Sequence, residues 1–510
     1  MAPDQKDLAR RVAAAGAWTV GARLSAKLID LAMLFCLARF LGPADFGLVA
    51  MAMAVVFVVE ALLDLPTSVA LLRGPSVTRA MLDTAFTLGL LRGFAIGVLL
   101  LALAWPLAWF NNEPRLAVLL SVLALAPAAR GMSSPRMVEY ARAFNFQPDA
   151  VVELSGKVLA FVVSVALAAA TGSYWAIAAA TICSPVLGTL ASYVVAPFRP
   201  RLSLSEWHRF SNFLGWNFVA QFCSALNWQI DRLLLSRLTP IAAFGQYSIA
   251  KQISEIPIQA LAVPLLRPAM TALASAGPAA GARYVQLSRA MLVVMVPAMT
   301  VPVLWPEALI RVALGPNWLS AAQWLQWISA ASLLGMPALL MGALTQMLDR
   351  THWLARRTVI DLLIRVPLVW WGAAHHGIPG VIAASAVSSL ATTAVSFLIV
   401  RHLSGASVRA QLGMLRIPFI AVLPAGALLW ATQPAVSGAA NVFGLVALGL
   451  PIFLLYLLVY GLCVWIVWRW TGRPAGFEQH AFETAAAWLA RYRRHRAAPG
   501  ESPAASGPGR

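Results

Sequence analysis

Apolar runs of about 20 residues recur along almost the whole chain, and short polar connections separate them. Such a run spans the hydrocarbon core of a bilayer as an α-helix, which rises about 1.5 Å per residue. The runs begin near Ala17, Phe46, Thr84, Leu116, Ala150, Trp175, Asn212, Ala243, Leu287, Ala321, Thr358, Ile378, Ile417 and Val442. This pattern predicts an all-α polytopic membrane protein with about fourteen transmembrane helices.

The composition supports this prediction, because 60% of the residues are hydrophobic and 11% are charged, against about 25% charged in an ordinary soluble domain. A net charge of +18 could indicate a nucleic-acid partner, but the basic clusters fall on alternate loops, as the positive-inside rule requires. We therefore expect no nucleic acid, and a multi-pass protein of the cell inner membrane with both termini cytoplasmic. The inner loops then contain Arg73, Arg79, Arg130, Arg136, Arg142, Arg199, Arg201, Arg209, Arg283, Arg289, Arg350, Arg356, Arg357, Arg401, Arg409 and Arg416, and the outer loops contain Arg39, Arg115, Arg237 and Arg311.

The predicted outer connections are short turns that leave no room for a catalytic domain. No G-x-x-x-x-G-K-[ST] phosphate loop occurs, so we do not expect nucleotide hydrolysis. His375 and His376 lie in an outer turn without a convincing third ligand, so no metal site is expected. We also expect no cleaved signal peptide. These features indicate a carrier and not an enzyme, without a cofactor.

Two parts of the chain match each other at a constant offset of 198 residues: Trp18 with Trp216, Arg39 with Arg237, Phe46-Gly47 with Phe244-Gly245 and Pro66 with Pro264. Six spans separate the repeats, so both keep the same membrane orientation and a pseudo-twofold axis along the membrane normal should relate them. Parallel repeats of this kind are typical of transporters. We predict a six-helix lobe over residues 1–200, a second over 201–404, an additional helix pair over 405–471 and a cytoplasmic tail over 472–510.

Ionisable side chains recur inside the predicted spans, where each is costly and therefore suggests a function. The deeper ones lie in the first two spans of each repeat. We predict that they line a cationic, water-filled cavity for an anionic substrate, since Arg and Lys bind phosphate. The acids beside them could bind H+ or Na+ and couple transport to an ion gradient, or could simply neutralise the bases. The substrate-binding candidates are Arg23, Lys27, Arg232, Lys251 and Arg267, and the ion-coupling candidates are Asp30, Glu60, Asp64, Asp231 and Glu255.

Two further charge pairs have a four-residue spacing nearer the cytoplasmic side, Glu153 with Lys157 and Asp361 with Arg365. Residues four apart lie on one helical face, so we interpret them as intrahelical ion pairs.

Several segments resemble the Wzx-type polysaccharide flippases of the multidrug/oligosaccharidyl-lipid/polysaccharide exporter superfamily. They are ARFLGPADFG (Ala38–Gly47), NWQIDRLLLSRLTPIAAFGQYSIA (Asn227–Ala250), GSYWAIAAA (Gly172–Ala180) and APFRPRLS (Ala196–Ser203). Asp231, Gly245 and Tyr247 occupy places where that family typically has an Asp, a Gly and a Tyr. The resemblance implies a two-lobed helical fold with a cavity lined by spans one, two, seven and eight.

By the same resemblance, the protein would flip polyprenyl-diphosphate-linked oligosaccharide repeat units to the periplasmic leaflet, for exopolysaccharide, capsule or O-antigen synthesis. Arg23, Lys27, Lys251 and Arg267 would face the diphosphate or acidic sugars. Partners would include the lipid-linked oligosaccharide and a polysaccharide polymerase with its export machinery. Two alternatives stay open: a lipid II flippase for peptidoglycan, and a membrane-embedded polymerase or ligase.

Overall fold

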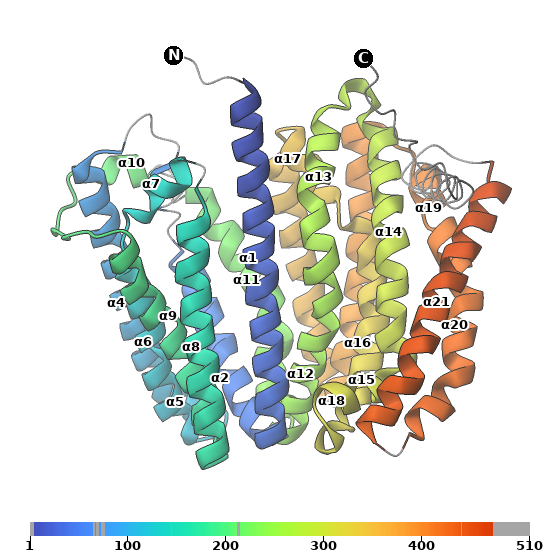
Figure 1. Ribbon diagram of the computed structural model, residues 1–510, viewed down its shortest axis with the longest axis horizontal. Helices are drawn as coiled ribbons and strands as arrows, with labels where there is room; N and C mark the ends of the chain where they lie inside the picture. The colour runs from blue at the N-terminus through green and yellow to red at the C-terminus, as the bar shows by residue number, and fades with distance from the viewer. Residues whose placement is uncertain are drawn as a thin grey trace, which may run out of the picture.

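The computed structural model describes residues 5–64, 67, 71–72, 77–143, 145–211, 215–439 and 441–472, which form the helical bundle of Figure 1. Ten of these helical segments are long and apolar enough to cross a membrane. Among the sequence features noted above, Pro66, Arg73, the side chains of Trp216, Arg209 and Arg267, and the tail from residue 473 lie outside the described residues.

Three of the fourteen predicted spans are not among those ten, and two others are joined in one of the ten. α1 (Gln5–Phe40) and α11 (Gly215–Leu238) are long enough but carry several charges. The fourth span is divided into α5 (Arg115–Leu123) and α6 (Leu125–Gly131). The 54-residue α18 (Thr351–Ser404) contains two spans, which meet at Gly377, where φ is 58° and ψ is −135°. The structure thus has a helical segment for each predicted span.

The helices form two lobes and a terminal pair (Figure 1). The N-terminal lobe contains α1, α2 (Pro43–Leu62), α4 (Arg79–Phe110), α5, α6, α7 (Met137–Arg142), α8 (Gln147–Thr171) and α9 (Trp175–Val195). After α10 (Trp207–Ser211), the C-terminal lobe contains α11, α12 (Ile241–Pro257), α13 (Val263–Ala274), α14 (Ala280–Leu304), α15 (Pro306–Ala313), α16 (Ala321–Gly335), α17 (Met341–Met347) and α18. A short α19 (Val408–Gly413) precedes the packed pair α20 (Arg416–Ser437) and α21 (Val442–Trp470).

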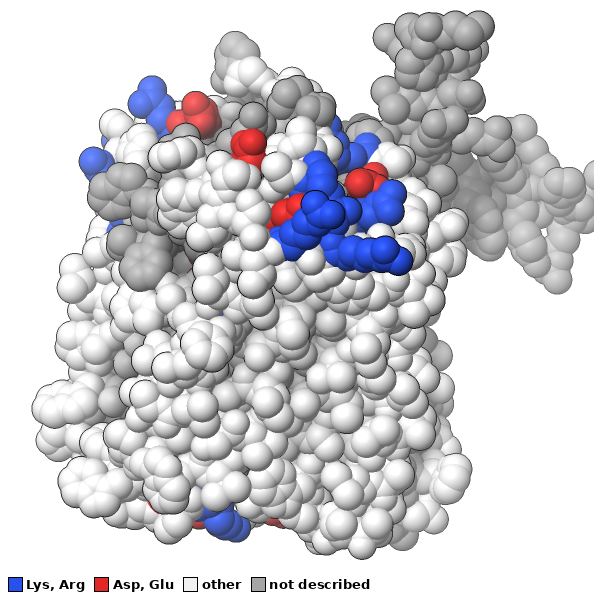
Figure 2. Space-filling view, turned by 90° about the vertical axis from the view of Figure 1, so that its left-hand side faces the viewer, with Lys and Arg blue, Asp and Glu red and all other residues white. Residues whose placement is uncertain are grey.

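The bundle has two ends, which differ in charge. α1 begins and α21 ends at the same end (Figure 1), which we call the termini face. Figure 2 shows charged side chains gathered at the termini face and, in smaller number, at the opposite face, with an uncharged belt between them. This is the pattern expected of a protein that crosses a bilayer.

The opposite face holds the four arginines predicted for outer loops, and each of them has a partner there. Arg39 donates to the Val312 carbonyl at 3.0 Å, Arg115 to Glu113 at 2.7 Å and Arg311 to the Ser437 carbonyl at 2.7 Å, and Arg237 lies over the Phe110 ring at 5.5 Å. Arg39, Arg311 and Arg237 therefore join the ends of different helices, whereas the Arg115 pair is local to the turn before α5.

The two lobes meet near the opposite face where α2 crosses α12. Pro43 begins α2, and the Asp45 carboxylate caps it by accepting the Gly42 N–H at 3.2 Å. A Cβ placed on Gly47 would lie 2.2 Å from the Ile241 carbonyl oxygen, and one on Gly245 would lie 1.8 Å from that of Pro43. Both pairs are related by the 198-residue offset, so the repeat predicted from sequence corresponds to a symmetric helix crossing that requires glycine at both positions.

Candidate functional site

The C-terminal lobe contains a buried charge cluster centred on Asp231 of α11. The Asp231 side chain is 2% exposed. It forms an ion pair with Lys251 of α12 and accepts hydrogen bonds from Arg365 of α18, at 3.0 and 3.2 Å, and from the Tyr247 hydroxyl at 3.0 Å. Three donor residues on two neighbouring helices thus hold one carboxylate, which is the arrangement that a buried charge needs.

A second acid, Asp361 of α18, has neutral hydrogen-bond donors as partners instead of cations. It accepts hydrogen bonds from the Asn227 side-chain amide at 2.5 Å and from the Ser388 hydroxyl at 3.0 Å. Arg365, four residues later, is directed to Asp231 instead. The predicted intrahelical pair of Asp361 and Arg365 is therefore wrong, because the helix packs so that each group finds its partner on a neighbouring element.

The N-terminal lobe pairs its acids with bases from neighbouring helices as well. Asp30 of α1 contacts Lys157 of α8 at 2.5 Å, so the predicted intrahelical pair of Lys157 with Glu153 is also wrong. In the last turn of α2 Glu60 forms an ion pair with Arg130 of α6, and just beyond that helix Asp64 pairs with Arg92 of α4 at 3.2 Å. These three acids are therefore already neutralised.

Asp30–Lys157 and Asp231–Arg365 join corresponding helices of the two lobes, although the 198-residue offset places Asp30 opposite Trp228, three residues before Asp231. α1 packs against α8, and α11 packs against the first part of α18. In each lobe an acid on the first helix pairs with a base on the fifth. The two lobes therefore share an ion pair between their first and fifth helices, but the acids are one helical turn out of register with the repeat.

Two of the predicted substrate-binding cations have no partner in the described part of the chain, namely Arg23 and Lys27 of α1. Both side chains are exposed and lie one helical turn apart. Glu255 on α12 is attracted electrostatically by Lys27, and also by Lys251 and Arg232. Arg232 donates one hydrogen bond to the Gln229 side-chain oxygen at 3.1 Å. The Nε of Arg232 is buried and has no hydrogen-bond partner among the described residues. Positive charge thus exceeds negative charge between α1, α11 and α12.

The two sides of the lobe interface differ in packing. α2 packs against both α11 and α12. By the internal repeat, the counterpart of the contact between α2 and α11 is a contact between α12 and α1. Among the described residues, α12 and α1 do not pack together to a comparable extent. The exposed Arg23 and Lys27 therefore lie on the looser side of the interface.

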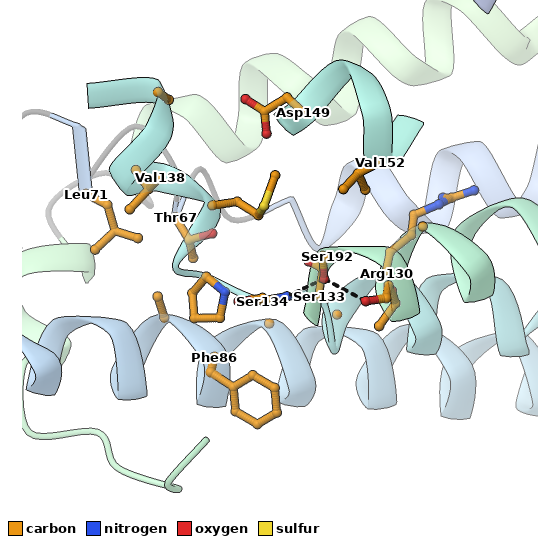
Figure 3. Close-up of a pocket in the computed structure, with 18 of the residues that line it drawn as sticks. Thr67, Leu71, Phe86, Arg130, Ser133, Ser134, Val138, Asp149, Val152 and Ser192 are labelled. Carbon is orange, nitrogen blue, oxygen red and sulfur yellow. Dashed lines mark hydrogen bonds between the residues drawn. The ribbon is translucent and has the colours of Figure 1, made fainter. Parts of the chain in front are cut away.

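A separate cavity of about 820 Å³ lies inside the N-terminal lobe. Figure 3 shows Asp149 and Val152 of α8 on one side of it, Phe86 of α4 on the other, and Ser134 bonded to Ser192 in its wall. The two arginines in its lining, Arg92 and Arg130, belong to the ion pairs described above. Both of these cations are thus already paired with acids of the same lobe.

Sequence reasoning missed several partners in these clusters. Arg130 was placed in a loop as a topology signal, although it neutralises Glu60. Asn227 and Ser388 carried no signal, because amides and hydroxyls in apolar helices do not reveal their partners.

A family model described as "Polysaccharide biosynthesis protein" matches residues 36–323, more than half of the chain. The succinoglycan biosynthesis transport protein ExoT of Rhizobium meliloti (strain 1021) is 25% identical over 227 residues, 44% of this chain and 46% of that protein. The chain thus matches about half the length of this curated relative.

Two solved structures share the fold. A lipid II flippase, MurJ, in an inward closed conformation superposes with a TM-score of 0.67 at 15% identity, covering 88% of this chain and 98% of that one. An inward-facing multidrug resistance MATE family transporter of the MOP superfamily superposes with a TM-score of 0.55 at 15% identity, covering 76% and 99%. These likenesses confirm the predicted all-helical fold, and by its family match the chain belongs to the polysaccharide biosynthesis protein family.

Proposed function

We propose that the protein is a flippase that moves polyprenyl-diphosphate-linked oligosaccharide repeat units across the inner membrane, from the cytoplasmic to the periplasmic leaflet, by alternating access. The termini face is cytoplasmic in this proposal, because it carries most of the exposed arginines. Family membership, the partial similarity to a succinoglycan transport protein and the fold shared with a lipid II flippase support this proposal.

One observation carries the proposal: Arg23 and Lys27, on the loosely packed side of the lobe interface, are cations that have no partner among the described residues. By contrast, five other bases of the two lobes are at least partly engaged: Arg92, Arg130, Lys157, Arg232 and Lys251. Arg offers a planar fork and Lys a point charge to phosphate oxygens. Because α1 and α12 are not packed together, a diphosphate could reach these groups from the membrane while its polyprenyl chain stays in lipid.

We further propose that Glu255 is the residue through which H+ or Na+ couples to transport. Asp30, Glu60, Asp64 and Asp231 are each held by a cation. Glu255 forms no ion pair in the described part of the chain, but Lys27 and Lys251 lie near enough to attract it electrostatically. Protonation or Na+ binding at Glu255 would increase the net positive charge beside the two unpartnered bases, and therefore their affinity for an anion.

The proposal is tested by extracting lipids from cells that carry Arg23→Ala with Lys27→Ala, and measuring lipid-linked repeat units by mass spectrometry. We expect flipping to fall roughly tenfold or more, since two charge-assisted contacts are lost, and repeat units to accumulate in the inner leaflet. Arg409→Ala with Arg416→Ala removes two exposed arginines from α19 and the start of α20, and should leave flipping unchanged.

Other outcomes would identify the alternatives. Accumulation of lipid II in place of repeat units would indicate a peptidoglycan precursor flippase. Unpolymerised glycan already outside the cell in a deletion strain would indicate a polymerase or ligase that acts after translocation. Normal amounts of lipid-linked intermediate in a deletion strain, with normal polymer, would refute a role in flipping.

A further inference from the structure

A hollow of about 690 Å³ lies at the termini face of the N-terminal lobe, away from the lobe interface. Its lining combines three arginines with two aromatic rings and two prolines: Arg79, Tyr193, Pro197, Phe198, Arg199, Pro200 and Arg201. Figure 2 looks onto this side of the lobe, and shows basic side chains gathered where the charged end meets the uncharged belt. The hollow is therefore expected to lie at the depth of the lipid headgroups.

The segment that forms the hollow is fastened to α4 through its backbone. The Arg201 N–H donates to Asp83 at 3.2 Å, the Ser203 N–H to Thr87 at 3.0 Å and the Glu206 N–H to Thr84 at 3.3 Å. All three acceptors are buried. Because the backbone supplies these contacts, the Arg199 and Arg201 side chains are not needed to hold the segment in place.

The three arginines have different environments. Arg79 is engaged: it pairs with Asp83 at 3.3 Å, donates to the Arg199 carbonyl and lies over the Phe198 ring at 4.6 Å. Arg199 and Arg201 are exposed, and their guanidinium groups have no partner among the described residues. The hollow thus has an aromatic floor, one fixed guanidinium and two that are free to bind an anion.

The surface next to the hollow is apolar. Val194 is 81% exposed at the end of α9, and Leu202, next to Arg201, is 72% exposed. Aliphatic side chains this exposed in a membrane protein contact acyl chains, while arginines one step further out meet headgroup phosphates. A soluble anion would have no use for the apolar border, whereas a lipid contacts both parts at once.

We propose that this hollow binds the headgroup of an anionic phospholipid of the adjacent leaflet, with Arg199 and Arg201 on its phosphate and the acyl chains against Val194 and Leu202. The site depends on the protein's position in a membrane and not on which substrate it transports. Bound lipid would fix the N-terminal lobe at a defined depth in the bilayer.

The test is native mass spectrometry of the full-length protein in neutral detergent, titrated with phosphatidylglycerol and, separately, with phosphatidylcholine of the same acyl chains. We expect the wild type to retain phosphatidylglycerol in preference, and Arg199→Ala with Arg201→Ala to weaken that retention by roughly 30-fold. Arg350→Ala with Arg401→Ala removes two exposed arginines of the C-terminal lobe and should leave the preferential retention of phosphatidylglycerol unchanged. Arg199→Lys with Arg201→Lys keeps the charge and should retain most of the binding, which separates loss of the site from loss of fold.

Three results would overturn the proposal: equal retention of the two lipids by the wild type, equal losses in the two alanine pairs, or displacement of phosphatidylglycerol by millimolar inorganic phosphate. The last would show a site for a free anion.

Discussion

In each lobe an acid on the first helix pairs with a base on the fifth, but the two acids have different surroundings. Asp231 of the C-terminal lobe is 2% exposed and has three partner residues, whereas Asp30 of the N-terminal lobe is 36% exposed and has one, Lys157. A buried carboxylate cannot give up its partners without leaving uncompensated charge, while a half-exposed one can exchange its partner for water. The buried Asp231 therefore ties α11, α12 and α18 of the C-terminal lobe together, and the N-terminal lobe contributes the exposed bases Arg23 and Lys27 to the interface.

The largest expected effect follows from removing the buried acid. Asp231→Asn leaves Lys251 and Arg365 buried and unpaired, and should destabilise the protein by about 3 to 5 kcal/mol. Asp30→Asn should cost less than that, because Asp30 is 36% exposed and its partner Lys157 22% exposed, so that water can replace part of the lost contact. The unfolding temperatures of both purified variants in detergent measure the difference. Equal losses would mean that the two pairs share one environment, and the comparison between the lobes would fail.

The glycine crossing offers the opposite comparison, since here the lobes are alike. Gly47→Ala and Gly245→Ala each place a Cβ against a backbone carbonyl of the other lobe, at 2.2 and 1.8 Å. Overpacking of this kind costs about 1 to 3 kcal/mol, and it should separate α2 from α12 at the opposite face. We expect both variants to lower the unfolding temperature by similar amounts.

The matched control for the crossing is Gly461→Ala in α21. A Cβ there meets nothing within 4 Å, and alanine is the better helix former. This variant should be neutral or slightly stabilising. An unfolding temperature that falls with Gly461→Ala as much as with Gly245→Ala would show that the helices respond to any added methyl group, and not to the crossing.

The sequence was sufficient to predict the spans and the repeat, but not the pairing of charges. Apolar run length and the distribution of arginines depend on the bilayer, which acts on each helix separately. Pairing depends on how neighbouring helices rotate against one another. Arg365 illustrates this: it lies four residues from Asp361 but reaches Asp231, because Asn227 and Ser388 already satisfy Asp361. Arg23 and Lys27 could be proposed from the sequence, whereas their lack of a partner could not.

The smallest expected effect concerns the two arginines that end the first helix of each lobe. Arg39 donates to the Val312 carbonyl at 3.0 Å, beside Trp318, whose indole N–H donates to the Ala38 carbonyl at 2.9 Å. Arg237 lies over Phe110 at 5.5 Å, a cation–π contact worth about 0.5 to 1 kcal/mol at an exposed site. A charged hydrogen bond contributes somewhat more, about 1.5 kcal/mol at the lower end of its range.

Arg39→Ala should therefore lower the unfolding temperature slightly more than Arg237→Ala, with Arg416→Ala, an exposed arginine at the start of α20, as the neutral reference. A larger loss for Arg237 would mean that the cross-lobe contact of the C-terminal lobe is the stronger one. The C-terminal lobe would then form the stronger contact at the opposite face, as Asp231 forms stronger contacts than Asp30. The glycine crossing would be the one part of the interface to which both lobes contribute equally.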